Sequence, residues 1–193
     1  MRIPLCLGLL AALLAAPGLA AAQDAVSPTA PRLLADGVNT LKGNDGARVT
    51  LRSTMTYDPV AGEYVREVFD AATGAFVERT VLTSPMIRPT AEEDAAAKAL
   101  ILADPEVAAL VAAAAYPVQV EGGFPLVREA GHGCGPGSRC LQYDVFEVGP
   151  GELGAERLRY VVVDLRTLTL FSNDFDVVRE GNLANPAAAR SSR

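Results

Sequence analysis

One stretch decides the fold: Thr90–Asp104 reads TAEEDAAAKALILAD, and Pro105–Ala115 continues as PEVAALVAAAA. Thr90 and Glu93 have the spacing of a capping box, in which each side chain accepts a hydrogen bond from the backbone N–H of the other residue. Apolar side chains then recur at close to helical spacing, at Leu100, Ile101, Val107, Leu110 and Val111. The stretch is therefore predicted to form a helix with one buried face.

The dipeptide Asp104-Pro105 interrupts this helical run. A proline disfavours helical angles in the residue before it, whereas Pro105 itself suits the first position of a new helix with Asp104 as its cap. We therefore expect one central helix that is bent, with its two pieces over 91–103 and 105–115.

Strand-like sequence lies on both sides of this helix. The segments rich in β-forming residues are 48–57, 63–69, 75–82, 118–120, 124–129, 141–148, 157–164 and 168–171, with a turn predicted at 121–123. The valine run at 161–163 indicates a strand that is buried on both faces. Strands, a helix and then more strands indicate an α+β fold, with a mostly antiparallel sheet packed against the bent central helix.

The amino-terminal segment is typical of a signal peptide. It has a basic start at Arg2, an apolar run, and the small residues 20–22 before Gln23. A membrane anchor is the alternative, but the run is shorter than the roughly 20 residues needed to span a bilayer, and Pro17-Gly18 interrupts it. We expect residues 1–22 to be cleaved and the protein to be periplasmic or secreted.

The rest of the chain divides by composition. Residues 23–42 are rich in Pro, Ala and Ser and are predicted to be a flexible tether, and 182–193 a disordered tail. Residues 43–181 are predicted to form a single α+β domain. The formal net charge is −6 and becomes one unit more negative when Arg2 is removed. An acidic chain of this kind argues against nucleic acid or stable membrane insertion as its target.

Four segments together resemble the small amino-terminal accessory domains of copper amine oxidases. They are DAATGAFV (70–77), PTAEE (89–93), ALILADPEV (99–107) and YVVVD (160–164). The resemblance implies a cystatin-like fold, in which a helix packs on an antiparallel sheet. It also implies an accessory role without catalysis, because the copper histidines and the quinone-forming tyrosine of that family lie in a separate, larger domain. This chain has one histidine and cannot supply that domain.

The segment CGPGSRC, Cys134–Cys140, contains both cysteines that remain after signal cleavage. In an exported chain we expect them to form a disulfide. A redox pair is one alternative, but such pairs usually show a Cys-x-x-Cys spacing before a helix. The other alternative is a copper or zinc site with His132. A bonded cystine offers no thiolates to a metal, and there is no second histidine to complete the site.

No other motif nominates catalytic chemistry. The glycine-rich segment 131–137 lacks the lysine and the following helix of a phosphate loop. The acids Asp144, Glu147, Asp164, Asp174 and Asp176 are too scattered along the chain to indicate a carboxylate pair. The sequence therefore predicts an exported, non-enzymatic binding or accessory protein without a cofactor, for an unknown protein or surface component. The alternative is a small periplasmic enzyme, or a copper protein that uses His132 and the Cys134/Cys140 loop.

Overall fold

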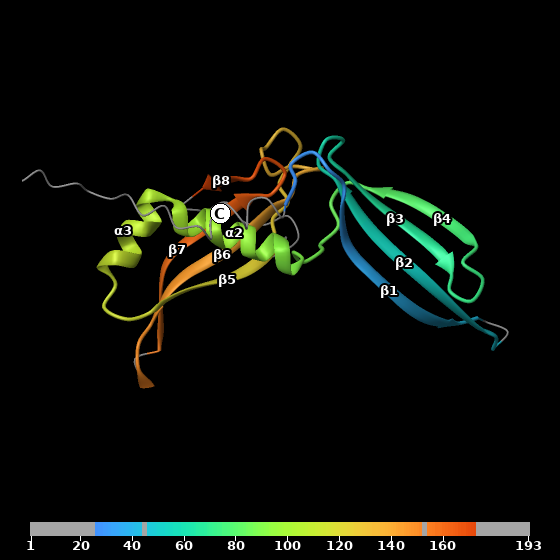
Figure 1. The fold of residues 1–193 in the computed structure, drawn as a ribbon, viewed down its shortest axis with the longest axis horizontal. Coiled ribbons are helices and arrows are strands. Elements are labelled where there is room, and N and C mark those ends of the chain that lie inside the picture. Colours follow the sequence, from blue (N-terminus) through green and yellow to red (C-terminus); the bar gives the residue numbers. More distant parts are fainter. Residues whose placement is uncertain (1–25, 44–45, 152–153, 173–193) are drawn as a thin grey trace, which may run out of the picture.

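Two separate four-stranded antiparallel sheets make up the described part of the chain (Figure 1). The structure is a computed structural model that describes residues 26–43, 46–151 and 154–172. The predicted signal peptide, tail and Gln23 lie outside these ranges. The α+β class and the antiparallel pairing are confirmed, but the prediction of one sheet is wrong. Each sheet is a simple meander, in which every strand pairs with the next in sequence.

The first sheet contains β1 to β4. Its strands are β1 (Arg32–Lys42), β2 (Arg48–Asp58), β3 (Glu63–Asp70) and β4 (Phe76–Leu82). The prediction of a flexible tether over 23–42 is wrong for residues 32–42. That segment is poor in β-forming residues, but it pairs with β2 from Arg32–Tyr57 to Lys42–Arg48. The segment is therefore extended because of its backbone hydrogen bonds to β2, and not because of its own β propensity.

The second sheet follows the helices. Its strands are β5 (Val118–Pro125), β6 (Cys140–Val148), β7 (Ala155–Asp164) and β8 (Thr169–Ser172). The turn predicted at 121–123 is wrong, because β5 continues through it with an irregularity between Gly122 and Phe124. β5 is the outer strand of its sheet.

Two helices connect the sheets, α2 (Ala91–Ala103) and α3 (Pro105–Ala113). The predicted break is confirmed, and Asp104 ends α2 and caps α3 through hydrogen bonds from the N–H groups of Glu106 and Val107. The capping box of Thr90 and Glu93 is also present. The chain thus has two short helices where one bent helix was expected. Both lie over one face of the second sheet (Figure 1).

The main core lies between the helices and the second sheet. Ile101 and Val107 are fully buried there against Val161 and Val163. Val162 points to the other face, where it packs with Leu126 and the two cysteines of the loop. β7 is therefore covered on both faces at residues 161–163, which confirms the inference from the valine run. Of the predicted helical stripe, Leu110 is only half-buried.

The first sheet has a much smaller core. Leu34, Met55, Tyr57 and Tyr64 are buried together, with Leu82 and Ile87 packed against them. These residues lie at the end of the sheet nearest the rest of the molecule. The other end projects away and, in the ranges that the structure describes, no helix packs on it (Figure 1).

Candidate functional site

The cysteine loop lies where the two sheets meet. Cys134 and Cys140 form a disulfide with a Cα–Cα distance of 5.5 Å, and both residues are buried. The N–H groups of Leu126 and Arg128 donate to the carbonyls of Cys140 and Cys134, which holds the loop against the segment that follows β5. The predicted pairing of the two cysteines is present, and the loop covers the face of β7 that the helices leave open.

Among the residues that the structure describes, His132 does not face a set of metal ligands. Its Nδ1 accepts a hydrogen bond of 3.0 Å from the N–H of Cys134, and its ring lies 5.3 Å from that of Phe171. Within 26–43, 46–151 and 154–172, no three His, Cys, Asp or Glu side chains are placed to hold a metal ion. The copper interpretation of this loop therefore has no ligand set in the described part of the chain.

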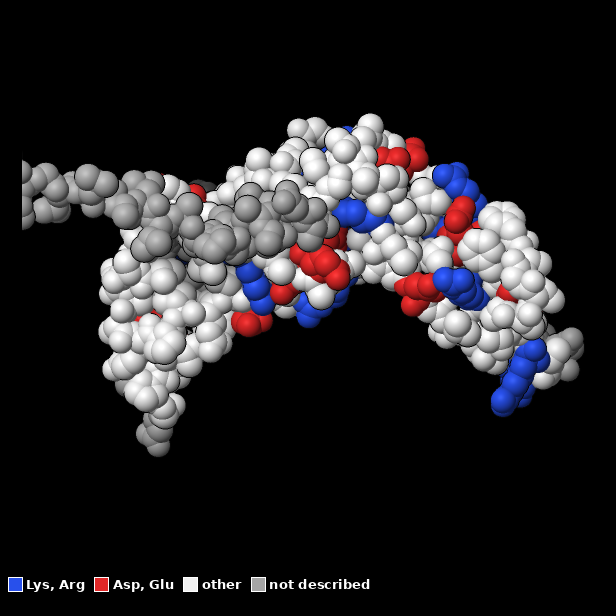
Figure 2. Space-filling model, viewed as in Figure 1, with Lys and Arg blue, Asp and Glu red and all other residues white. Residues whose placement is uncertain are grey.

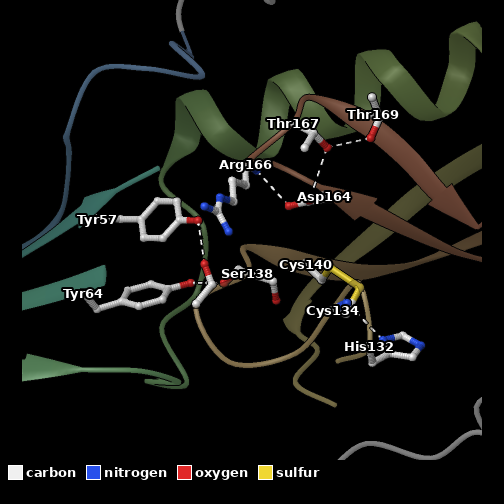
Figure 3. Close-up of a disulfide and its surroundings, with 11 residues drawn as sticks. Tyr57, Tyr64, His132, Cys134, Ser138, Cys140, Asp164, Arg166, Thr167 and Thr169 are labelled. Atoms are coloured by element: carbon white, nitrogen blue, oxygen red, sulfur yellow. Dashed lines mark hydrogen bonds between the residues drawn. A yellow bond between two sulfur atoms is a disulfide. The ribbon is translucent and has the colours of Figure 1, made fainter. Parts of the chain in front are cut away.

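The tip of the loop is bound by two tyrosines of the first sheet. The hydroxyl of Tyr57 donates to the carbonyl of Gly137 at 3.0 Å, and that of Tyr64 donates to the carbonyl of Ser138 at 2.6 Å (Figure 3). The two tyrosines are register partners on β2 and β3, and their ring centroids are 4.5 Å apart. Burial raises the pKa of Tyr57, and it raises the pKa of Tyr64 to about 12. Both hydroxyls therefore stay protonated and donate.

Close backbone contact accompanies these hydrogen bonds. Gly137 has a φ of 82°, and a Cβ built on it would lie 2.6 Å from the carbonyl oxygen of Gly62. A side chain at this position would be strained and would collide with the turn between β2 and β3. Gly137 also donates its N–H to the carbonyl of Thr83 at 2.8 Å. Glycine is needed here because the loop and the first sheet meet backbone to backbone.

A buried charge cluster lies beside the loop. Glu93 and Arg139 are each 1% exposed, and two hydrogen bonds of 3.2 and 2.6 Å join the guanidinium to the carboxylate. Arg139 also donates to the carbonyls of Ile87 and Arg88. Arg32 lies 3.5 Å from the same carboxylate. The carboxylate of Glu93 thus faces one cation from β1 and a second cation from the cysteine loop.

The pKa values of the two arginines in this cluster are shifted in opposite directions. Burial lowers the pKa of Arg139, but the hydrogen bonds and the negative charge of Glu93 outweigh it and leave that pKa above its usual value. Burial lowers the pKa of Arg32, and Glu93 only partly opposes this. The difference follows the geometry, because Arg139 hydrogen-bonds the carboxylate directly and Arg32 does not reach it as closely.

Arg166, in the turn between β7 and β8, adds a further link between the sheets. Its guanidinium donates to the carbonyls of Pro59 and Val60 in the turn between β2 and β3. Asp164 fixes the start of its own turn by accepting from the N–H of Arg166 and the hydroxyl of Thr167. We call the whole set the inter-sheet joint; its members are Arg32, Tyr57, Tyr64, Glu93, Gly137, Ser138, Arg139 and Arg166.

The inter-sheet joint has the properties of a structural connection. Its tyrosine hydroxyls and the Glu93–Arg139 ion pair are directed at protein groups. Of the acids named from the sequence, Asp144 and Glu147 lie along β6, and Asp164 accepts from the N–H of Arg166, a member of the joint. Asp174 and Asp176 are outside the described ranges. Burial raises the pKa of Asp144, and its ion pair with Arg157 only partly opposes this.

A groove lies on the first sheet, away from the joint. It has a volume of about 460 Å³, and we call it the first-sheet groove; its lining residues are Asn39, Thr40, Leu41, Leu51, Ser53, Arg66, Val68, Val77 and Glu78. Arg66 and Glu78 form an exposed ion pair within it. Leu41 and Val77 are more than half exposed. Apolar side chains are therefore open to the surroundings on this face of the sheet.

The space-filling view shows the outline of this part of the molecule (Figure 2). The first sheet forms one arm of an arched molecule, with basic and acidic side chains interspersed among uncharged ones along it. Surface ion pairs on the arm include Arg52–Asp36, Arg66–Glu78 and Arg79–Glu67. It is neither a basic nor an acidic patch, so charge alone does not select its ligand.

Sequence reasoning found the disulfide but missed the joint and the groove. Glu93 is followed by Ala97 and Ile101 at four-residue intervals, and both are fully buried. That spacing places Glu93 on the buried face and was the available signal for a buried acid. Nothing comparable points to Arg139, Tyr57 or Tyr64, because their partners are distant in sequence: a carboxylate and two carbonyls for Arg139, and one backbone carbonyl for each tyrosine.

Comparison with known proteins does not assign the chain to a family. No family model matches the sequence, and no curated protein is significantly similar to it. A search of the described helices found none that is both long and apolar enough to cross a membrane.

Proposed function

We propose that this chain is an exported, non-enzymatic binding or accessory protein, and that the first-sheet groove receives an apolar segment of another exported protein. The observation that carries the proposal is the groove itself, about 460 Å³ on a sheet face where Leu41 and Val77 remain exposed. Exposed apolar side chains gathered in one groove are characteristic of an interaction site.

The two halves of the molecule have different roles in this proposal. The second sheet and its helices contain the main core and supply the stability. The inter-sheet joint fixes the first sheet to that core through Tyr57, Tyr64 and Arg166. The first sheet is then held as a rigid projecting arm, and a rigid surface loses little conformational freedom when it binds.

The fold is consistent with a cystatin-like arrangement in the second half of the chain. Helices α2 and α3 come directly before the antiparallel meander of β5 to β8, and they cover one of its faces. We extend the resemblance to the accessory domains of copper amine oxidases on this basis, as a proposal about an accessory role. The buried disulfide is consistent with an oxidising compartment, periplasmic or extracellular.

Two matched substitutions on β4 test the use of the groove. Val77 lines the groove, whereas Val81 pairs with Val65 on the opposite face of the same sheet. Their exposed fractions are similar, 53% and 44%. The mature chain, immobilised, is used to capture proteins from the exported fraction of its native cells, and each captured protein is identified by mass spectrometry.

We expect Val77→Asp to abolish capture of the specific partner, because a charge in the groove opposes apolar contact. Val81→Asp is expected to leave that capture unchanged. Equal capture by both variants and the unaltered chain contradicts the groove as the binding surface. The unfolding midpoint of each variant shows that any loss of capture is not a loss of fold.

A further inference from the structure

The outer strand β1 presents a long open edge. It is the first strand of its sheet and pairs only with β2 among the strands described. All eight residues from Ala35 to Lys42 are exposed, including Val38 at 61% and Leu41 at 55%. Backbone N–H and C=O groups along the free side of such a strand form a template for a further strand.

The sequence of this edge is complementary to itself in one antiparallel register. If Asn39 is placed opposite Asn39 of a second copy, the ladder extends over residues 36–42. Asp36 then lies opposite Lys42 of the second copy, and this attraction occurs twice by symmetry. Val38 lies opposite Thr40 of the second copy. Opposite charges that face one another directly across an antiparallel ladder stabilise it, and like charges destabilise it.

Within one copy, Lys42 lacks a negatively charged partner among the described residues, so it is available to Asp36 of a second copy. Lys42 lies directly opposite Arg48 in the β1–β2 register, which is an unfavourable pairing of two cations. Its side chain makes no ion pair with the residues that the structure describes. A carboxylate arriving on the outer side of Lys42 offsets this repulsion. Asp36 of the second copy is in that position, and its own ion pair with Arg52 lies on the inner side.

Shape complementarity supports the same register. Gly37 lies opposite Leu41 of the second copy, and a Cβ built on Gly37 would meet nothing within 4 Å. The open space above Gly37 therefore accommodates the exposed leucine. Because the symmetry axis is perpendicular to the sheet, paired side chains stay on the same face. Leu41 also lines the first-sheet groove, so the grooves of the two copies open on one face beside each other.

We propose that the protein forms a two-fold symmetric dimer through antiparallel pairing of β1 with β1 of a second copy, centred on Asn39. The pairing joins two four-stranded sheets into one of eight strands. It covers the open edge of β1 and places the two first-sheet grooves on one continuous surface. The inference does not rest on the proposed function, because it concerns the strand edge and not what the groove receives.

A charge-exchange experiment tests both the dimer and its register. Lys42→Glu places a carboxylate opposite Asp36 of the second copy and turns two attractions into two repulsions. Asp36→Lys does the same with two cations. Size-exclusion chromatography with light scattering should show a dimer for the unaltered mature chain. For each variant alone, the dissociation constant of the dimer should rise at least about tenfold.

An equimolar mixture of the two variants restores both attractions. In a mixed dimer the unaltered Asp36 of one chain faces the unaltered Lys42 of the other, and the introduced glutamate faces the introduced lysine. We expect the mixture to recover a dimer that contains one chain of each kind, which differently tagged chains identify. Arg79→Glu reverses a charge on the opposite edge strand β4 and serves as the control. It should leave the dimer intact.

Three outcomes overturn the proposal: an unaltered chain that is monomeric at all accessible concentrations, a dimer unaffected by Lys42→Glu, or a mixture that does not recover the dimer. Circular dichroism of each variant establishes that the sheet is retained. The capture experiment with Val77→Asp is a separate readout. A monomer that still captures its partner overturns this inference and leaves the proposed function standing, and a dimer that captures nothing does the reverse.

Discussion

Arg139 reaches from the end of the cysteine loop to Glu93 in the first turn of α2, and both side chains are 1% exposed where they meet. The pair connects a helix cap to a disulfide-bonded loop across 46 positions of sequence. It lies beside Tyr64, whose hydroxyl binds the neighbouring carbonyl of Ser138. The position of the first sheet on the rest of the molecule therefore depends on a few buried polar contacts.

Glu93→Gln tests the buried pair. Glutamine preserves the shape of the side chain and an acceptor for the capping box, but it leaves Arg139 and Arg32 without a negative charge. Removing one partner of a buried ion pair typically costs about 3–5 kcal/mol of unfolding free energy. We expect a loss of that size in urea unfolding. The control is Glu78→Gln, which alters an ion pair whose side chains are 45% and 47% exposed and should cost less than about 1 kcal/mol. Similar small losses in both variants contradict a buried role for Glu93.

Tyr64 should make the free energy of unfolding depend on pH in the alkaline range. Burial raises its pKa from 10.0 to about 12 in the folded protein. A raised pKa contributes stability that is fully present below the unfolded value and is lost as the pH rises through the folded value. The free energy of unfolding should therefore fall between about pH 10 and pH 12, and the slope should be smaller for Tyr64→Phe. Leu102→Ala, at an exposed position without a titrating group, is the control and should leave the slope unchanged. An unchanged slope in Tyr64→Phe is the result that excludes this assignment.

Replacing Cys134 and Cys140 together with serine should lower stability without changing the fold. Closing so short a loop is worth about 2 kcal/mol on the chain-entropy estimate, and the buried hydroxyls add to the loss. Melting temperature and far-ultraviolet circular dichroism measure the two expectations. Thiol titration of the unfolded, unreduced mature protein should find no free thiol. Two reactive thiols in that titration contradict the disulfide, and a melting temperature equal to that of the parent contradicts its contribution.

Two adjacent residues of α2 report which face of the helix is buried. Ile101 is fully buried in the main core, and Leu102 is 47% exposed. Ile101→Ala should cost about 2–5 kcal/mol of unfolding free energy, because it removes buried methyl groups and leaves a cavity. Leu102→Ala should cost less than about 1 kcal/mol. Chemical unfolding of both variants measures the difference, and equal losses contradict the orientation of the helix.

Local sequence signals determined the elements that depend on short-range physics. The capping box and the Asp104-Pro105 break specified α2 and α3, because capping hydrogen bonds and proline sterics act within a few residues. Alternating β-forming residues located β2, β3 and β4 to within about two residues. Cysteine count and spacing in a chain with a signal-like amino terminus specified the disulfide.

Tertiary structure alone decided the rest. Residues 32–42 carry little β propensity of their own and become a strand because β2 supplies their hydrogen-bond partners. The division into two sheets is decided by which edges pair, and periodicity does not encode that choice. The inter-sheet joint joins Tyr57, Tyr64 and Arg139 to groups 46–80 positions away. Such contacts have no local signature, because a buried hydroxyl or guanidinium needs an acceptor that only the folded chain brings within reach.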